Sequence, residues 1–118
     1  MDRDLIQSLK LPAALVHQAR SLEHLGVSEQ AWPRAAVLEV IDHLGGQPIA
    51  VLAGHVLVRR DQRLTHNYDN WHSDRNPYET FAEFASRSQR EARAYVSRYP
   101  IVSPEPFFTL VLSAEAAT

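Results

Sequence analysis

The fold depends on residues 63–78, Arg63-Leu64-Thr65-His66-Asn67-Tyr68-Asp69-Asn70-Trp71-His72-Ser73-Asp74-Arg75-Asn76-Pro77-Tyr78, which join the most strand-like part of the chain to its longest predicted helix. This stretch holds one of the two tryptophans and two of the six histidines. Its centre, residues 67–71, is both polar and aromatic. Such a mixture suits a turn whose short polar side chains bond the backbone, or a surface that contacts a partner. Both interpretations stay open from the residues alone.

Immediately upstream, residues 47–60 predict a strand. β-Branched and aliphatic residues fall on both of its faces, a pattern typical of a strand that is covered on both sides or central in its sheet. Gly54 interrupts the run, and a glycine inside a strand often marks a bulge or a close backbone approach. A single bent strand and a tight hairpin at Ala53-Gly54 both fit, and we expect the bent strand. A polar turn over 59–63 then leads into a returning antiparallel strand over 64–68 and a loop over 69–76.

Downstream, Asn76-Pro77-Tyr78-Glu79 has the pattern of a capping box with proline at the first helical position. It predicts a helix over 77–98 that Tyr99-Pro100 ends. One face of this helix is apolar except for the small Ser88, where we expect a close approach to the sheet: Phe81, Phe84, Ala85, Ser88, Ala92, Tyr95, Val96 and Tyr99.

The opposite face of the same helix is charged. Glu83–Arg87 and Arg87–Glu91 have the spacing of ion pairs. Arg90 and Arg93 lie on this side as well, which favours a solvated helix face over an anion site.

The first half of the chain predicts two further helices. One begins at Pro12 and ends at Gly26; the other begins at Pro33 and ends at Gly45-Gly46. The buried stripe of the second comprises Ala36, Val37, Val40, Ile41 and Leu44. Trp32, which precedes Pro33, is expected to pack over the end of that helix.

These elements, with a final strand over 107–112, predict an α+β fold. We expect a small antiparallel sheet of three to four strands with two to three helices packed on it, including one long helix near 77–98. The 118 residues suit a single domain, 1–118, with residues 1–11 and 113–118 frayed.

Composition excludes several classes of function. The chain has no cysteine, so disulfides and thiolate chemistry are excluded. Its net charge of −2 argues against a domain that grips nucleic-acid phosphates. The charged N-terminus shows no signal-peptide pattern, and the longest apolar run, 48–58, is too short to span a bilayer. We therefore expect a cytoplasmic protein that binds neither nucleic acid nor membrane.

Catalytic patterns are absent from the sequence: it has no Gly-rich phosphate loop, no His-Glu-x-x-His and no nucleophile elbow. One alternative remains, a small metal-binding or hydrolytic enzyme domain that would use His55, His66, Asp69 and His72, with Asp74 as a further ligand. His66 and Asp69 could also form an acid–base pair. The spacing of these residues is not specific for either role.

Several motifs together resemble the immunity protein 40 family of bacterial polymorphic-toxin systems. They are the 51–56 segment around Gly54, the Tyr68-Asp69-Asn70-Trp71 motif, the positions Ser88, Ala92 and Tyr95 on the long helix, and the late aromatic strand from Phe107. The resemblance covers roughly residues 26–112. Where the family usually reads Gly-Gly-Asp-Val, this chain has Ala53-Gly54-His55-Val56.

The resemblance implies an α+β cytoplasmic protein that binds a cognate toxin domain and neutralises it by occlusion, without catalysis and without a cofactor. It also implies a role in competition between bacteria, as in contact-dependent inhibition. The expected partner-binding residues are Tyr68, Asp69, Asn70, Trp71, His72 and His55. Neither the toxin nor the oligomeric state follows from it.

A third interpretation is a structural module of a larger complex in which Trp71 belongs only to the core. In that case Trp71→Ala would cost roughly 3–5 kcal/mol of stability, and any loss of binding would follow from unfolding.

Overall fold

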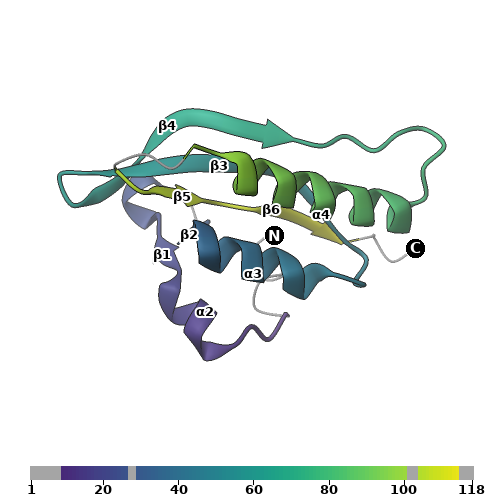
Figure 1. Ribbon diagram of the computed structural model, residues 1–118, viewed down its shortest axis with the longest axis horizontal. Coiled ribbons are helices and arrows are strands. Elements are labelled where there is room, and N and C mark those ends of the chain that lie inside the picture. Colours follow the sequence, from purple (N-terminus) through teal and green to yellow (C-terminus); the bar gives the residue numbers. More distant parts are fainter. Residues whose placement is uncertain (1–8, 27–28, 101–103, 115–118) are drawn as a thin grey trace.

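The computed structural model describes residues 9–26, 29–100 and 104–114. They form an α+β fold, as predicted (Figure 1). Within these described residues, three helices accompany a sheet of six strands, somewhat more strands than the three to four expected. In chain order the elements are α2 (Ala13–Gln18), β1 (Arg20–Ser21), the 3-10 turn η1 (Glu23–Leu25), β2 (Gln30–Pro33), α3 (Arg34–Leu44), β3 (Ile49–Arg60), β4 (Arg63–His72), α4 (Phe81–Arg98), β5 (Pro106–Phe108) and β6 (Val111–Ala114).

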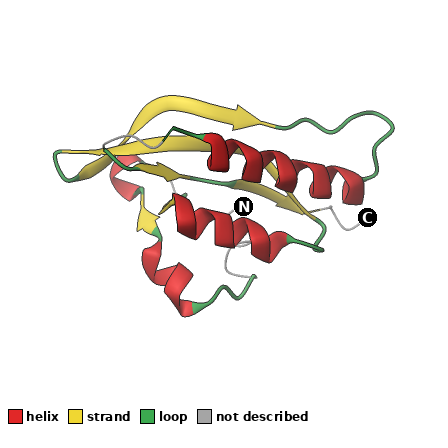
Figure 2. Cartoon of the chain, viewed as in Figure 1, coloured by secondary structure: helices red, strands yellow, loops and turns green. Residues whose placement is uncertain are grey.

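The sheet is antiparallel, and β3 is its central strand. β4 pairs with one edge of β3, while β5 and β6 follow one another along the other edge. β2 pairs with β5, and β1 with β2, so the strand order is β1-β2-β5-β3-β4 with β6 also on β3. β4 therefore forms one edge of the sheet. Helices α3 and α4 lie next to each other against the sheet (Figure 2).

The central position of β3 explains why its apolar residues fall on both faces. Val56 packs in the main core beneath α3 and α4. Leu57, the next residue, points to the opposite face, where Leu22 and Phe107 cover it. The prediction of a single strand through Gly54 is confirmed, with pairing irregularities at two places.

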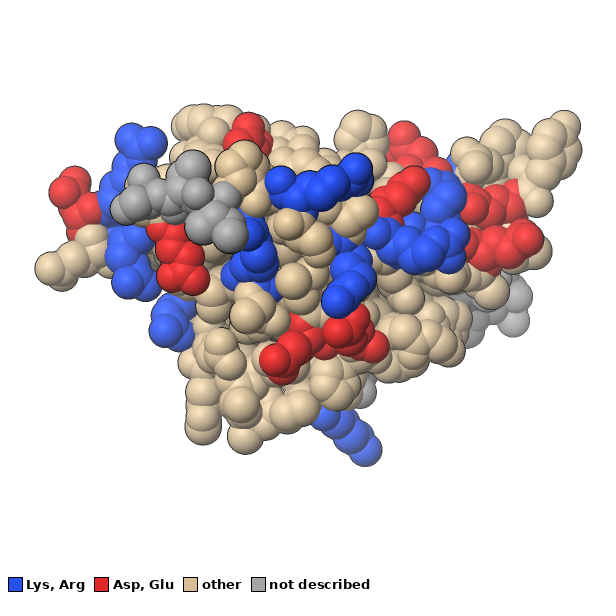
Figure 3. Space-filling model, in the orientation of Figure 1, with Lys and Arg blue, Asp and Glu red and all other residues tan. Residues whose placement is uncertain are grey.

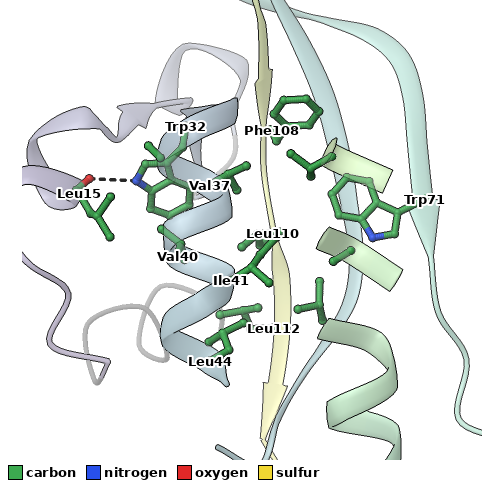
Figure 4. Packing of buried hydrophobic residues seen from close by; sticks show 14 of the residues in the cluster. Leu15, Trp32, Val37, Val40, Ile41, Leu44, Trp71, Phe108, Leu110 and Leu112 are labelled. Atoms are coloured by element: carbon green, nitrogen blue, oxygen red, sulfur yellow. Dashed lines mark hydrogen bonds between the residues drawn. The ribbon is translucent and has the colours of Figure 1, made fainter. Parts of the chain in front are cut away.

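The main core contains both tryptophans (Figure 4). Trp32 lies in β2, next to the start of α3, and its indole N–H donates to the carbonyl of Leu15 over 3.0 Å. Trp71 lies on the opposite side of the cluster (Figure 4). The predicted stripe of the second helix is confirmed in full: Ala36, Val37, Val40, Ile41 and Leu44 are all buried.

The long helix begins one turn later than predicted. Thr80 is the N-cap, and its capping box is completed by Glu83, whereas residues 76–79 form a turn. The sequence holds two consecutive boxes, 76–79 and 80–83, and the second contains Phe81 and is followed directly by Phe84, both buried. The close approach at Ser88 is confirmed, because its hydroxyl accepts the N–H of Val51 at 2.9 Å.

The predicted helix over 12–26 is wrong in its second half. α2 ends at Gln18, and Ala19 is extended. Arg20 and Ser21 then pair with β2, which gives their backbone groups sheet partners instead of helical ones. Gly26 does adopt the left-handed conformation (φ 78°), but it ends η1.

Two strand boundaries also differ from the prediction. β4 continues to His72, so residues 69–72 of the loop predicted over 69–76 are strand. The predicted final strand over 107–112 is two strands, separated at Thr109 and Leu110. There the side chain of Thr109 replaces a backbone acceptor, and its Oγ1 accepts the N–H of His55 at 3.0 Å.

Of the segments expected to be frayed, 1–8 and 115–118 lie outside the described residues. In the described part of the chain, the structure has no helix whose length and apolar character would let it cross a membrane.

Candidate functional site

The most unusual backbone of the β3–β4 pair is at Tyr68. Pairing runs from Leu57↔His66 directly to His55↔Asn70, so the single residue Val56 faces three residues of β4. Tyr68, the middle one, has φ 71°. Its side chain is 86% exposed. A bulky residue in the left-handed region costs roughly 1–2 kcal/mol, so the surrounding structure must hold it there.

Side chains on both sides hold this bulge. Asn67 Oδ1 accepts the N–H of Asp69 at 2.9 Å, and Asn70 Nδ2 donates to the carbonyl of Tyr68 at 3.1 Å. The Tyr99 hydroxyl then joins the bulge to the end of α4. It accepts from Asn67 Nδ2 at 2.7 Å and donates to Asp69 Oδ2 at 2.5 Å. The bulge is therefore a supported structure rather than a loose loop.

Trp71 lies beneath this surface and is buried. Its ring stacks on Tyr95, with 4.6 Å between ring centroids and 28° between planes. It also lies directly over Gly54, where an added Cβ would fall 2.0 Å from the ring. This explains the glycine in the middle of β3. Among the described residues the indole N–H of Trp71 has no hydrogen-bond acceptor.

The other predicted contact residues lie on the opposite side of the strand pair. Because side chains alternate along a strand, Asn70 and His72 face away from the helix that Trp71 contacts. Both are exposed, and half-buried His55 is paired with Asn70. The ring of His66 lies 6.1 Å from that of His55 and 6.4 Å from that of Tyr68.

The four residues of the enzyme or metal alternative do not meet at one site. His55 contacts His66, whereas Asp69 is bonded to Tyr99, and His72 Nε2 lies 3.7 Å from Asp74 Oδ2. Within residues 9–26, 29–100 and 104–114, no group of three or more histidine, aspartate or glutamate side chains is placed to hold a metal ion. The geometry gives this alternative no support.

An open groove of about 540 Å³ lies between the end of β4 and α4. Trp71 and His72 contribute to one wall; Arg87, Arg90, Glu91 and Arg98 contribute to the other. Figure 3 shows blue basic side chains over the α4 side of the molecule, with red acidic residues next to them.

At one end of the groove, Arg87 is the centre of an ion-pair cluster. Its guanidinium bonds both carboxylate oxygens of Glu79 at 2.8 Å, and Glu91 at 3.0 and 3.1 Å. It also donates to the carbonyl of Asp74 at 2.6 Å. These bonds tie the connection after β4 to the side of α4. The predicted pair Arg87–Glu91 is present, while Glu83 instead accepts the N–H of Thr80.

The cluster shifts the acidity of its members. The Arg87 hydrogen bond, followed by the backbone N–H of Asn76, lowers the pKa of Glu79 to about 2. The Ser73 hydroxyl, followed by Arg87, lowers the pKa of Glu91. The hydrogen bonds to Glu79, and then those to Glu91, raise the pKa of Arg87. Both carboxylates and the guanidinium are thus held in their charged forms.

Two tyrosines next to the bulge, Tyr95 and Tyr99, have raised pKa values, which favours their neutral, protonated forms. Burial raises the pKa of Tyr99, and the hydrogen bond to the Asp69 carboxylate raises it further. Burial also raises the pKa of Tyr95, with a smaller contribution from the negative charge of Asp69. The Tyr99 hydroxyl therefore keeps its proton and remains a donor to Asp69.

Sequence reasoning missed two parts of this site. It placed Tyr99 only on the apolar face of the helix, although its hydroxyl bonds the bulge. It also read Glu79 as a capping residue, although the carboxylate bonds Arg87. A tyrosine at a helix end carries a polar group that needs a partner when buried, which is the available signal for Tyr99. Pairing Glu79 with Arg87 requires knowing where the helix begins.

Comparison with known proteins gave one match. The model of the family described as Immunity protein 40 matches residues 21–112. No curated protein and no solved structure matches the chain.

Proposed function

The chain belongs to the immunity protein 40 family, and from this we propose that it binds a cognate bacterial toxin domain and neutralises it by covering a surface that the toxin needs. The action requires no catalysis and no cofactor. The encounter takes place in the cytoplasm and involves neither nucleic acid nor membrane. The biological setting is competition between bacteria.

The bulge at Tyr68 is the observation that best supports a binding surface on β4. An aromatic side chain that is 86% exposed sits in a backbone conformation that residues of its kind rarely adopt. Such strain persists where the surrounding structure enforces it, and it is concentrated at functional sites. Tyrosine is also among the residues that contribute most to protein interfaces.

We assign the contact surface to the exposed residues around the bulge. Tyr68 is the central contact, and Asn70, His72 and half-buried His55 extend the surface along the face turned away from the helices. Asp69 lies at its edge, where the Tyr99 hydroxyl orients its carboxylate. Trp71 supports the surface from below by its packing against Tyr95 and Gly54.

The first experiment identifies the partner. The purified chain captures proteins from its native host, and each captured protein is expressed alone and then together with the chain. The toxin is the captured domain that stops growth alone and is tolerated in the presence of the chain.

The second experiment tests the surface with that toxin domain. Tyr68→Asn removes the aromatic side chain, and asparagine tolerates the left-handed conformation well. We expect the variant to fold at least as stably as the wild type and to bind the toxin roughly 30-fold more weakly, as for the loss of a central interface contact. The matched control is Tyr78→Asn, because Tyr78 is 99% exposed on the connection to α4.

Wild-type affinity of a folded Tyr68→Asn variant would move the interface away from the bulge and leave the immunity function standing. Absence of any toxin whose effect the chain relieves would contradict the function itself.

A further inference from the structure

The groove beside α4 contains two arginines whose charge is not neutralised within the described part of the molecule. Among the described residues, Arg90 bonds only the Ser86 hydroxyl of its own helix, at 2.8 Å. Within the same part of the chain, Arg98 bonds only the carbonyl of Ala94, at 3.2 Å. Neither forms an ion pair with a described acidic residue.

The other arginines of α4 are different. Arg87 is paired with Glu79 and Glu91, and Arg93 with Asp42 of α3 at 2.7 Å. Around the groove, the three arginines Arg87, Arg90 and Arg98 exceed the two carboxylates bonded to Arg87 by one, which leaves a local net charge of +1 in a chain whose net charge is −2. Arg90 and Arg98 are eight residues apart, which corresponds to roughly 12 Å along the helix axis.

A second feature of the groove also lacks a partner. Trp71, which is 8% exposed, forms part of the groove wall. Its indole N–H has no acceptor among the described residues. Trp32, in contrast, donates to Leu15. The groove therefore offers two cationic donors at its surface, and the indole N–H of Trp71 lies buried beneath it.

From these features we infer that the groove is the docking site for an acidic segment of the toxin partner, whose carboxylates lie beside Arg90 and Arg98. The inference rests on the proposed immunity function and adds the charge of the partner to it. His72 lines the end of the groove and also follows Asn70 along the edge strand β4, so the groove and the surface around Tyr68 meet at this strand.

A nucleic-acid strand fits this groove less well than an acidic protein segment. Glu91 lies in the groove wall with its carboxylate held charged, and Glu79 is held charged on the other side of Arg87. These carboxylates oppose a ligand with a charge on every unit, whereas two carboxylates about 12 Å apart can avoid them.

The test uses the toxin domain identified by capture and growth relief. Arg90→Gln and Arg98→Gln are combined in one variant, which removes both positive charges and leaves shorter, polar side chains. We expect its affinity to fall at least tenfold and its association rate to lose most of its dependence on salt. The control is Arg93→Gln, which alters the flank paired with Asp42 and should keep wild-type association kinetics.

A second readout follows the tryptophans. In a proton–nitrogen spectrum of the labelled chain, toxin binding should shift the Trp71 indole resonance and leave that of Trp32 in place. The inference is overturned if the double glutamine variant associates with wild-type rate and salt dependence while it still protects cells. It is also overturned if a single-stranded oligonucleotide displaces the toxin from the wild type but not from the variant. Failure of the wild type to protect cells would remove the immunity function and the inference with it.

Discussion

The hydroxyl of Tyr99 donates to Asp69 Oδ2 over 2.5 Å, and this bond joins the C-cap residue of the long helix to the bulge of the edge strand. The ring of Tyr99 packs edge-on against Phe108, with 5.6 Å between centroids. Arg34 at the start of α3 donates to its carbonyl. Tyr99 thus connects α3, α4, β4 and β5 at the end of the sheet where the exposed bulge lies.

Removal of the Tyr99 hydroxyl should loosen the bulge without opening the core. Tyr99→Phe keeps the ring on Phe108 but leaves Asp69 and Asn67 without their shared partner. We expect a loss of about 1–2 kcal/mol in the free energy of unfolding, measured in urea, because a hydrogen bond to a charged group is lost at a partly exposed site. Tyr78→Phe, at an exposed position, is the control and should change nothing.

The contact between Gly54 and Trp71 predicts a large effect from a single methyl group. Gly54→Ala places a Cβ about 2.0 Å from the indole ring, so the ring or the strand must move. We expect a loss of about 3 kcal/mol in the free energy of unfolding. In a Gly54→Ala, Trp71→Leu double variant the two losses should be less than additive. Strict additivity would mean that the two residues do not share this contact.

The hydrogen bond from the Val51 N–H to Ser88 Oγ implies that removing this one oxygen atom lowers the stability of the fold. Ser88→Ala leaves the buried N–H of Val51 without its acceptor. We expect a loss of about 1–3 kcal/mol, since an unpaired buried donor carries the full cost of its desolvation. Ser86→Ala, on the exposed side of the same helix, should lie within about 0.5 kcal/mol of the wild type. Equal effects of the two substitutions would exclude a special role for the Val51–Ser88 bond.

The lowered pKa of Glu79 in the ion-pair cluster around Arg87 predicts that stability depends on pH in the acid range. The pKa of Glu79 is lowered to about 2 from 4.5, so its contribution to stability is present above about pH 4.5. The contribution is lost as the pH falls through the folded-state pKa of about 2, because the unfolded chain binds the proton first. Glu79→Gln should therefore lose less stability than the wild type between about pH 5 and about pH 2.5.

Urea unfolding at both pH values measures this difference. Glu39→Gln, on the exposed side of α3, is the matched control and should keep the pH dependence of the wild type. If Glu79→Gln also keeps it, the acid sensitivity arises elsewhere in the chain.

Much of the fold could be predicted because local patterns and tertiary packing agree. The stripe of α3 and the strand through Gly54 follow periodicities that the core also requires. The errors occur where tertiary contacts outweigh local preference. Residues 19–25 have a helical pattern, but Leu22 is needed to cover Leu57 on the far face of the sheet.

The candidate site was predictable in its residues but not in its geometry. The Tyr68–His72 motif was identified from its composition, yet composition could not show that Trp71 points into the core while Tyr68 points outward. That difference arises because β4 continues through residues 69–72 with alternating side chains, and pairing with β3 decides which face joins the core. Likewise, the spacing of Arg90 along the helix did not reveal that it forms no ion pair with a described acidic residue, because this depends on where those residues lie in the fold.

Growth of bacteria that express the toxin domain is the most direct measurement of the central claim. The domain is produced alone, with the wild-type chain, and with Tyr68→Asn or Tyr78→Asn at equal levels of folded protein. We predict growth with the wild type and with Tyr78→Asn, and arrest with Tyr68→Asn. Full protection by Tyr68→Asn would contradict the claim that this chain neutralises its toxin through the surface around the β4 bulge.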